Sequence, residues 1–185
     1  MIIIKIEDIF VVKEERDIKF LKDRNLGLIN GRDYFLSSYE VLFCMKKYKG
    51  KVYEVIKEEI LDSLNVKKLK EKVKKEVIEL NINDIINILN YNKYLVYEDL
   101  KNRGYIVKSG MKYGFDFRVY DKGIKEKEDH SLWLVDIINV ENEDINPLDF
   151  LAKNRVAHSV RKKILLAFID IEKEISYYEV GWKRV

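Results

Sequence analysis

Cysteine, proline and long apolar runs are scarce in this chain of 185 residues, which contains one Cys and one Pro. Because Cys44 stands alone, an internal disulfide and a cysteine-based metal cluster are both excluded. The apolar N-terminus is interrupted at Lys5, so it is too short for a signal peptide, and no run reaches the roughly 18–20 apolar residues of a membrane span. We therefore expect a soluble, cytoplasmic protein with no membrane partner.

The composition is that of a folded and heavily charged protein. Hydrophobic residues make up 47% of the chain, which argues against global disorder. Charged residues make up 36% of the chain, but the 35 Lys and Arg residues are nearly balanced by 32 Asp and Glu residues, so the net charge is only +3. This balance excludes neither an RNA ligand nor an acidic partner, and the length allows one large domain or two small ones.

Residues 1–90 predict an N-terminal α+β domain. Branched apolar residues suggest short strands at 2–6 and 9–12, and a further strand is expected at 51–55. Ser37 stands three residues before Glu40 and an apolar run follows, which is the signature of a capping box that starts a helix over 37–48. We expect Gly50 to end that helix.

A lysine-rich segment at 63–78 connects this part to the rest of the chain. Val66, Leu69, Val73 and Val77 recur at helical spacing with lysines between them, which predicts a charged helix. Such a helix could face RNA, or it could simply present a solvated surface. The sequence leaves both interpretations open.

Residues 91–185 predict a second α+β domain, so the fold class is α+β with two domains. A helix over 93–102 ends before Gly104, and Asn146-Pro147 begins a second helix that runs to about residue 161. We expect the apolar residues of that helix to point inward: Leu148, Leu151, Ala152, Val156 and Val160. Strands are expected at 105–107, 115–120, 131–138, 164–169 and 175–182.

Three residues in this second half could carry chemistry, although each has an ordinary structural explanation. Tyr120 is one of 12 tyrosines, and Lys162 follows a helix whose C-terminus favours a cation. His130 stands between a charged loop and an apolar strand, where its side chain can reach solvent. The other histidine, His158, lies among apolar helical residues, so we expect it to be packed and structural.

Several segments, in a consistent order, resemble the catalytic domain of archaeal tRNA-intron endonucleases. They are YLVYEDL at 94–100, RGYIVKSG at 103–110, KYGFDFRVY at 112–120, His130-Ser131, RVAHSVRKK at 155–163, Tyr177-Tyr178 and Trp182. The resemblance covers about residues 93–182, and the RVAHSVRKK segment is the most diagnostic part. It implies a mixed-sheet nuclease domain with flanking helices at 91–185.

The resemblance implies that Tyr120 is the general base, His130 the general acid and Lys162 the electrostatic stabiliser, with Tyr113 as a competing base. RNA supplies its own nucleophile, the 2′-hydroxyl, so the reaction needs proton transfers and charge stabilisation but no metal or other cofactor. The expected products are a 2′,3′-cyclic phosphate and a 5′-hydroxyl. A tyrosine has a reference pKa of about 10, and a nearby lysine would favour its charged form.

The same resemblance implies a substrate and an assembly. The substrate is precursor tRNA with a bulge–helix–bulge, and Arg155 and Arg184 are the expected RNA-binding residues, since arginine planes stack on unstacked bases. Two bulges require two active sites, which implies a homotetramer or a heterotetramer with a structural subunit. The aromatic strand at 175–182 suits pairing across a twofold axis.

Two other functions are weighed against this one. A two-metal nuclease needs clustered carboxylates, whereas Asp116 and Asp136 each stand alone in an apolar strand pattern. A non-catalytic RNA-binding or structural subunit of a heteromeric endonuclease is the stronger alternative. The presence of Tyr120, His130 and Lys162 together argues against it.

Overall fold

The structure is a computed structural model that describes residues 1–55, 77–123, 131–141 and 144–183. The chain divides into two compact units, Met1–Asn90 and Tyr91–Val185. Each unit contains a mixed sheet with helices, so the predicted α+β class is confirmed. Most of the lysine-rich segment, His130 and Arg184 lie outside the described residues.

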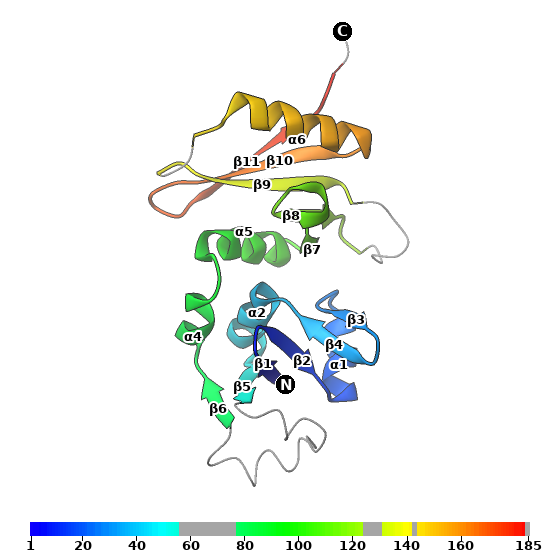
Figure 1. Ribbon diagram of the computed structural model, residues 1–185, viewed down its shortest axis with the longest axis vertical. Helices are drawn as coiled ribbons and strands as arrows, with labels where there is room; N and C mark the ends of the chain where they lie inside the picture. Colours follow the sequence, from blue (N-terminus) through cyan, green and yellow to red (C-terminus); the bar gives the residue numbers. More distant parts are fainter. Residues whose placement is uncertain (56–76, 124–130, 142–143, 184–185) are drawn as a thin grey trace. The chain divides into compact units, whose positions relative to one another are not determined.

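The first unit is built on a six-stranded sheet in the order β3-β4-β2-β1-β5-β6 (Figure 1). Its central strands β1 and β5 are parallel, and the other neighbours are antiparallel. The described elements are β1 (Ile2–Ile6), β2 (Ile9–Val12), α1 (Glu15–Lys22), β3 (Leu28–Asn30), β4 (Asp33–Leu36), α2 (Ser38–Tyr48), β5 (Lys51–Val55), β6 (Val77–Leu80) and α4 (Ile82–Asn87).

The local signals in this unit are mostly confirmed. Ser37 and Glu40 form the predicted capping box at the start of α2, because each side chain accepts a hydrogen bond from the other residue's backbone N–H. Helix α2 ends at Tyr48 as expected, but the left-handed residue that stops it is Lys49, with a φ of 52°, and not Gly50. Val77 was expected to continue a helix, but it starts β6, where it pairs with Val55.

The second unit is a five-stranded sheet in the order β11-β10-β9-β8-β7, with α5 on one face and α6 on the other (Figure 1). Strands β9 and β10 are parallel and are joined through α6, and the remaining neighbours are antiparallel. The elements are α5 (Tyr91–Asn102), β7 (Ile106–Ser109), η2 (Met111–Tyr113), β8 (Phe117–Tyr120), β9 (Trp133–Asn139), α6 (Pro147–Ser159), β10 (Lys163–Ile169) and β11 (Ile175–Val180).

The start of α6 is as predicted, but its inward face is not. The Asn146 side chain caps the helix by accepting from the backbone N–H groups of Leu148 and Asp149, and Pro147 follows at the first position. Leu148, however, is 77% exposed, and Leu151 and Val156 are exposed as well. Ala157 is the helix residue buried in the core, with Phe150 and Val160 packed beside it.

The prediction for α6 is wrong because the helix has two apolar faces. Apart from Val160, which packs on the core as predicted, the residues chosen from spacing are exposed, whereas the shorter set that includes Phe150 and Ala157 covers the sheet. The core beneath this shorter set contains Leu134, Ile138, Ile164 and Leu166 from β9 and β10. In the part of the chain that the structure describes, no helix is long and apolar enough to cross a membrane.

Candidate active site

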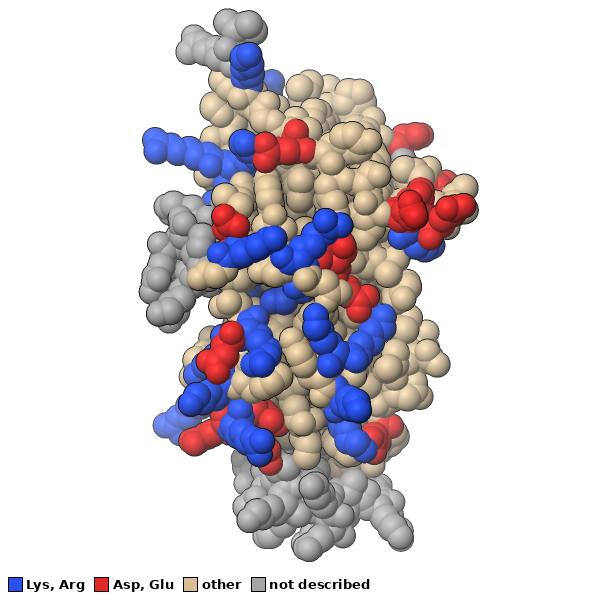
Figure 2. Space-filling view, turned by 180° about the vertical axis from the view of Figure 1, so that it is seen from behind, with Lys and Arg blue, Asp and Glu red and all other residues tan. Residues whose placement is uncertain are grey.

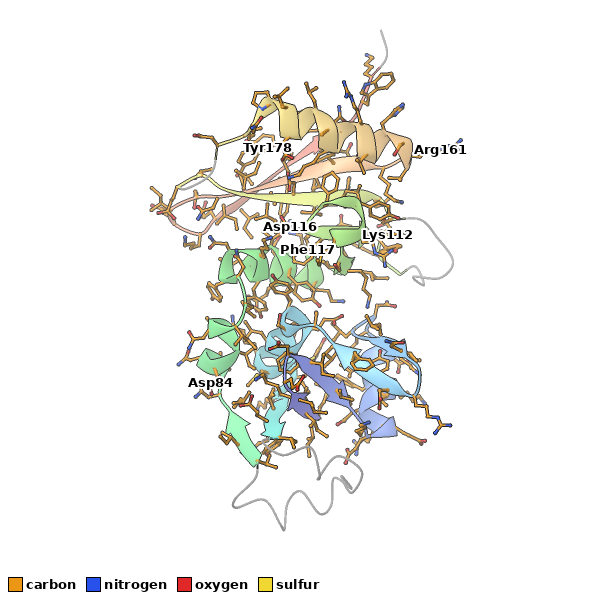
Figure 3. The ribbon with its side chains drawn as sticks, in the orientation of Figure 1. Asp84, Lys112, Asp116, Phe117, Arg161 and Tyr178 are labelled. Atoms are coloured by element: carbon orange, nitrogen blue, oxygen red, sulfur yellow. The ribbon has the colours of Figure 1, made fainter. Side chains whose placement is uncertain are left out.

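Lys162 is positioned by the end of α6. The backbone N–H of Lys162 donates to the carbonyl of Ala157 at 2.9 Å, and Arg161 adopts a φ of 55°. This is the Schellman type of helix ending, in which one left-handed residue reverses the chain. The reversal delivers Lys162 directly to the start of β10, and Figure 3 marks Arg161 at this end of α6.

The contacts of Lys162 differ from those of the lysine that follows it. The Lys162 ammonium donates to the backbone carbonyl of Ser131 at 3.1 Å, which is a neutral acceptor. The Lys163 ammonium donates to the Glu179 carboxylate at 2.6 Å, so its charge is neutralised. Together with the indole N–H of Trp133, that lysine holds the pKa of Glu179 below its usual range.

Tyr120 is the last residue of β8 and is held by packing. It is 5% exposed, and the Arg118 guanidinium lies 5.6 Å from the centre of its ring. A buried ring has little rotamer freedom, so its packing fixes the position of the phenol. The competing tyrosine, Tyr113, precedes β8 and partly packs against the α6 core at the opposite end of that strand.

The strand registers align Tyr120 and Lys162 across the sheet. Val119 pairs with Trp133, and Lys163 also pairs with Trp133. Tyr120 follows Val119 and Lys162 precedes Lys163, so the two residues lie at the same end of β8 and β10, on either side of β9. The Leu132 N–H donates to the Val119 carbonyl at 2.7 Å, one residue off the β8–β9 register, so the ladder is bulged at this point. Neighbouring strands are about 4.8 Å apart, so β8 and β10 are separated by about 10 Å, within the combined reach of a tyrosine and a lysine side chain.

The third predicted residue, His130, lies outside the described residues, but its covalent neighbour is part of this arrangement. Ser131 is buried and accepts the hydrogen bond from the Lys162 ammonium. The structure therefore brings together two of the three sequence-predicted residues, Tyr120 and Lys162, and the attachment point of the third. We call Tyr120, Leu132 and Lys162 the site row.

Arg155 is exposed on α6, two turns before Lys162. One turn after Arg155 comes His158, which was expected to be packed in the core but is exposed. Its imidazole instead lies against the indole of Trp182, with ring centroids 4.3 Å apart and an interplanar angle of 30°. His158 points away from the core because α6 buries Ala157, so its neighbour in sequence must face outward. Arg184, the other predicted RNA-binding residue, lies outside the described residues.

Two carboxylates near the sheet have structural partners. Asp116 accepts from the Ile137 backbone N–H at 3.0 Å and from the Lys93 ammonium, which joins α5 to the sheet. Asp136 pairs with Lys153 of α6 at 2.8 Å, and burial raises the pKa of this carboxyl despite that lysine. Among the described residues, no group of three or more His, Cys, Asp or Glu side chains could hold a metal ion.

The fold therefore defines an α+β protein whose second sheet carries a phenol and an ammonium group at the same end of two of its inner strands. Residues 90–177 match the family described as tRNA intron endonuclease, catalytic C-terminal domain. Three similar proteins are the tRNA-splicing endonucleases of Methanothermobacter thermautotrophicus, Thermococcus kodakarensis and Pyrococcus furiosus, with identities of 43%, 42% and 38%.

These alignments extend well beyond the catalytic domain. They cover 75%, 75% and 88% of this chain and 85%, 85% and 84% of the three relatives, in the same order. The chain belongs to the tRNA-splicing endonuclease family, whose members are endoribonucleases. The resemblance noted in the sequence is thereby confirmed.

Proposed function

We propose that this chain cleaves precursor tRNA at bulge–helix–bulge exon–intron junctions, with Tyr120, His130 and Lys162 as its catalytic residues. The observation that carries this proposal is the site row, in which Tyr120 and Lys162 lie at the same end of β8 and β10 and the Lys162 ammonium donates to the backbone of Ser131. Family membership supports the choice of precursor tRNA as the substrate.

The reaction is a transesterification within the RNA. Tyr120, as a phenolate, takes the proton of the 2′-hydroxyl while that oxygen forms a bond to the adjacent phosphorus. The bond from phosphorus to the 5′-oxygen breaks, and His130 protonates the leaving oxygen. The products are a 2′,3′-cyclic phosphate and a 5′-hydroxyl, and every proton is accounted for without a metal ion.

Lys162 is suited to stabilising the negative charge that builds up on the phosphorane. Its described hydrogen bond is with a carbonyl, so among the described residues no carboxylate neutralises it in the way that Glu179 neutralises Lys163. A fixed cation of this kind stabilises the transition state more than the ground state, because the charge on the phosphate oxygens increases during attack.

Binding of the RNA is proposed to involve Arg155 and Arg184. Figure 2 shows Lys and Arg side chains interspersed with Asp and Glu over the face it presents. A mixed surface gives little nonspecific attraction for a phosphate backbone. A substrate with a distinctive shape and unstacked bases fits such a surface better than a long regular duplex does.

We also propose that two copies of the chain pair through β11, as part of a tetramer. This strand is an edge of its sheet, and Tyr178 on it is 58% exposed. Beside it lies an open groove of about 580 Å³ lined by Val140, Leu166, Phe168, Asp170, Glu174, Ser176 and Tyr178. An exposed edge with an apolar groove favours association, and a second copy would cover both.

The test is incubation of the purified full chain with a bulge–helix–bulge RNA in excess EDTA, followed by analysis of the product ends. We expect cleavage at both junctions with cyclic phosphate ends. Abolition of cleavage by EDTA would instead support a metal nuclease. Tight binding without cleavage, with activity restored only by a second subunit, would support the non-catalytic structural role.

A further inference from the structure

Two positively charged residues are paired on the strands β7 and β8. Lys108 of the edge strand β7 is directly opposite Arg118 of β8. Arg118 is in turn opposite Leu134, whose side chain is part of the core beneath α6, so both cations belong to the α6 face of the sheet. Tyr120 follows Arg118 by two residues and shares its face, because side chains alternate along a strand. The Arg118 guanidinium lies 5.6 Å from the centre of the Tyr120 ring.

The stability of the sheet alone does not explain this pair. Like charges directly opposite each other destabilise two paired strands. A lysine on an edge strand discourages pairing with another chain, which is a sufficient reason for Lys108. Arg118, however, is on an inner strand and is only partly exposed, so its guanidinium gives up some of its hydration. An anionic ligand on this face would stabilise both charges.

The order of the strands determines where the two cations lie relative to the proposed catalytic groups. Lys162 precedes β10, and the order β10-β9-β8-β7 places Lys108 on the opposite side of Tyr120 from Lys162. In the proposed reaction, Lys162 contacts the scissile phosphate and Tyr120 contacts the 2′-hydroxyl of the nucleotide on its 5′ side. An RNA strand that continues in the same direction brings its next phosphate to Arg118 and Lys108.

The two side chains suit a phosphodiester. An arginine presents a planar fork that binds two phosphate oxygens together, and a lysine adds a compact point charge. Neighbouring strands are about 4.8 Å apart, so side chains at directly opposite positions can reach the same phosphate. Neither side chain is required for the proton transfers assigned to Tyr120 and His130.

We propose that Lys108 and Arg118 form a phosphate-binding subsite for the phosphodiester on the 5′ side of the nucleotide whose 2′-hydroxyl attacks. This inference rests on the proposed function. The subsite holds the RNA on the nucleophile side of the cleaved bond, so that the 2′-hydroxyl faces Tyr120. It assigns to β7 and β8 a role in substrate binding that is separate from the roles of Arg155 and Arg184.

The first experiment measures binding of a bulge–helix–bulge RNA that carries a 2′-deoxy nucleotide at the cleavage site and therefore cannot react. Arg118→Gln and Lys108→Gln are each expected to weaken binding about tenfold, since each removes a hydrogen bond to a charged group. Each should also lower the slope of log K against log salt concentration by about 0.7, which is the loss of one phosphate contact. Arg118→Lys should keep the slope of wild type.

The matched control is Arg103→Gln. Arg103 follows α5 and pairs with Asp99 at 2.7 Å, so this change removes the same charge from the same unit on its other face. Binding should stay within about twofold of wild type and the salt slope should not change. An equal loss in Arg103→Gln and Arg118→Gln would mean that net charge, and not a subsite, attracts the RNA. Urea denaturation verifies that Arg118→Gln is folded, and Lys108→Gln, on the edge strand, provides the same test if it is not.

The second experiment locates the phosphate. A neutral methylphosphonate replaces the phosphodiester on the 5′ side of the 2′-deoxy nucleotide, and a control RNA carries it two nucleotides away on the 3′ side. Arg118→Gln should bind the first RNA as wild type does, because the contact is already lost, but should still bind the control RNA about tenfold more weakly. A tenfold loss on both RNAs would overturn the assignment of the subsite.

Cleavage kinetics separate the subsite from the catalytic groups. At saturating cleavable RNA, the single-turnover rates of Arg118→Gln and Lys108→Gln should stay within about threefold of wild type. Normal binding with a large loss of rate would place Arg118 in the catalytic machinery and overturn its role in the subsite.

The subsite and the proposed function fail in different ways. If wild type binds the RNA with the expected dependence on Arg118 and Lys108 but never cleaves it, the catalytic proposal fails and the subsite stands. If wild type cleaves the RNA, and both glutamine variants bind it with the affinity and salt slope of wild type, the subsite is overturned and the catalytic proposal stands. If wild type does not bind the RNA, both are overturned.

Discussion

The two helices that cover the second sheet make very different contacts with it. Helix α5 is fastened to the sheet by side chains along its length: Lys93 binds Asp116, the Tyr97 ring packs on Phe117, and Asp99 accepts from the Tyr177 hydroxyl. Helix α6 buries Ala157, packs Phe150 on the core and pairs Lys153 with Asp136, but it leaves Leu148 and Leu151 in water.

We therefore expect the two faces of this sheet to have different roles, one in stability and the other in function. The α5 face is fastened by packing and by hydrogen bonds, so a change there is expected to alter folding. The α6 face carries Tyr120, Lys162, His158 and the exposed apolar residues, so a change there is expected to alter RNA chemistry or assembly. The predictions below test this division, from the largest expected effect to the smallest.

The sharpest test uses the neighbouring lysines that point to opposite faces. Lys162→Ala is expected to lower the single-turnover cleavage rate by about 10²–10³-fold, since it removes the charge that opposes the developing phosphorane. His130→Ala should lower the rate by about 10²–10⁴-fold through loss of the general acid. RNA binding, measured with the 2′-deoxy substrate, should change much less than either rate.

The matched control is Lys163→Ala. Its ammonium is paired with Glu179 on the α5 side, so its removal should change the cleavage rate by less than about threefold, as expected for an exposed ion pair. Equal losses in Lys162→Ala and Lys163→Ala would mean that general positive charge, and not a placed ammonium group, supports cleavage. That outcome would contradict the assignment of Lys162.

The second prediction compares leucines on the two helices. Leu100 of α5 is 2% exposed, so Leu100→Ala should lower the free energy of unfolding by about 2–5 kcal/mol, measured by urea denaturation. Leu151 of α6 is exposed, and Leu151→Ala should cost less than about 0.5 kcal/mol at a protein concentration too low for association. Similar costs at both positions would mean that α6 is buried as α5 is.

Sequence alone predicted the elements well because their signals are local. The capping box of Ser37 and Glu40, the Asn146-Pro147 helix start and the strand predicted at 175–182, observed at Ile175–Val180, each depend on a few adjacent residues. The helix stop before Gly104, whose φ is +93°, is a signal of the same kind. Such signals can be recognised in a sequence because the hydrogen bonds and backbone preferences behind them involve only neighbouring residues.

The candidate site needed more than local signals. Tyr120 and Lys162 were singled out through a family resemblance, but their placement at the same end of β8 and β10 depends on two strand registers that sequence spacing does not specify. The error on α6 has a related cause, because apolar spacing marks a face for burial without saying what covers it. Leu148 and Leu151 have the spacing expected of core residues, but both side chains are exposed to water in the single chain.

The third prediction tests what covers that face. Tyr178→Glu places a charge in the apolar groove beside β11 and should shift the molecular mass in light scattering from the tetramer toward smaller species. The control is Met111→Glu, which changes another exposed apolar residue, near the far edge strand β7, and should leave the mass unaltered. If wild type is already monomeric and fully active, the proposed assembly is wrong.

The smallest effect concerns the tyrosine next to Tyr178, on the α5 side of the same strand. The Tyr177 hydroxyl donates to the Asp99 carboxylate at 2.9 Å, so Tyr177→Phe should cost about 1 kcal/mol of stability at pH 8. Burial, together with this carboxylate, raises the pKa of Tyr177 above its ordinary value near 10.

The sign of the pH dependence follows from that raised pKa. The folded state keeps the Tyr177 proton where the unfolded state has released it, so the stabilisation is complete below about pH 10 and declines as the pH rises further. Urea denaturation from pH 8 to 11 should therefore show the gap between wild type and Tyr177→Phe closing above pH 10, with Tyr178→Phe following wild type throughout. If the difference in unfolding free energy between wild type and Tyr177→Phe stayed constant, Tyr177 would have the same pKa in the folded and unfolded states. The α5 face would then shield its side chains from water no better than the α6 face does.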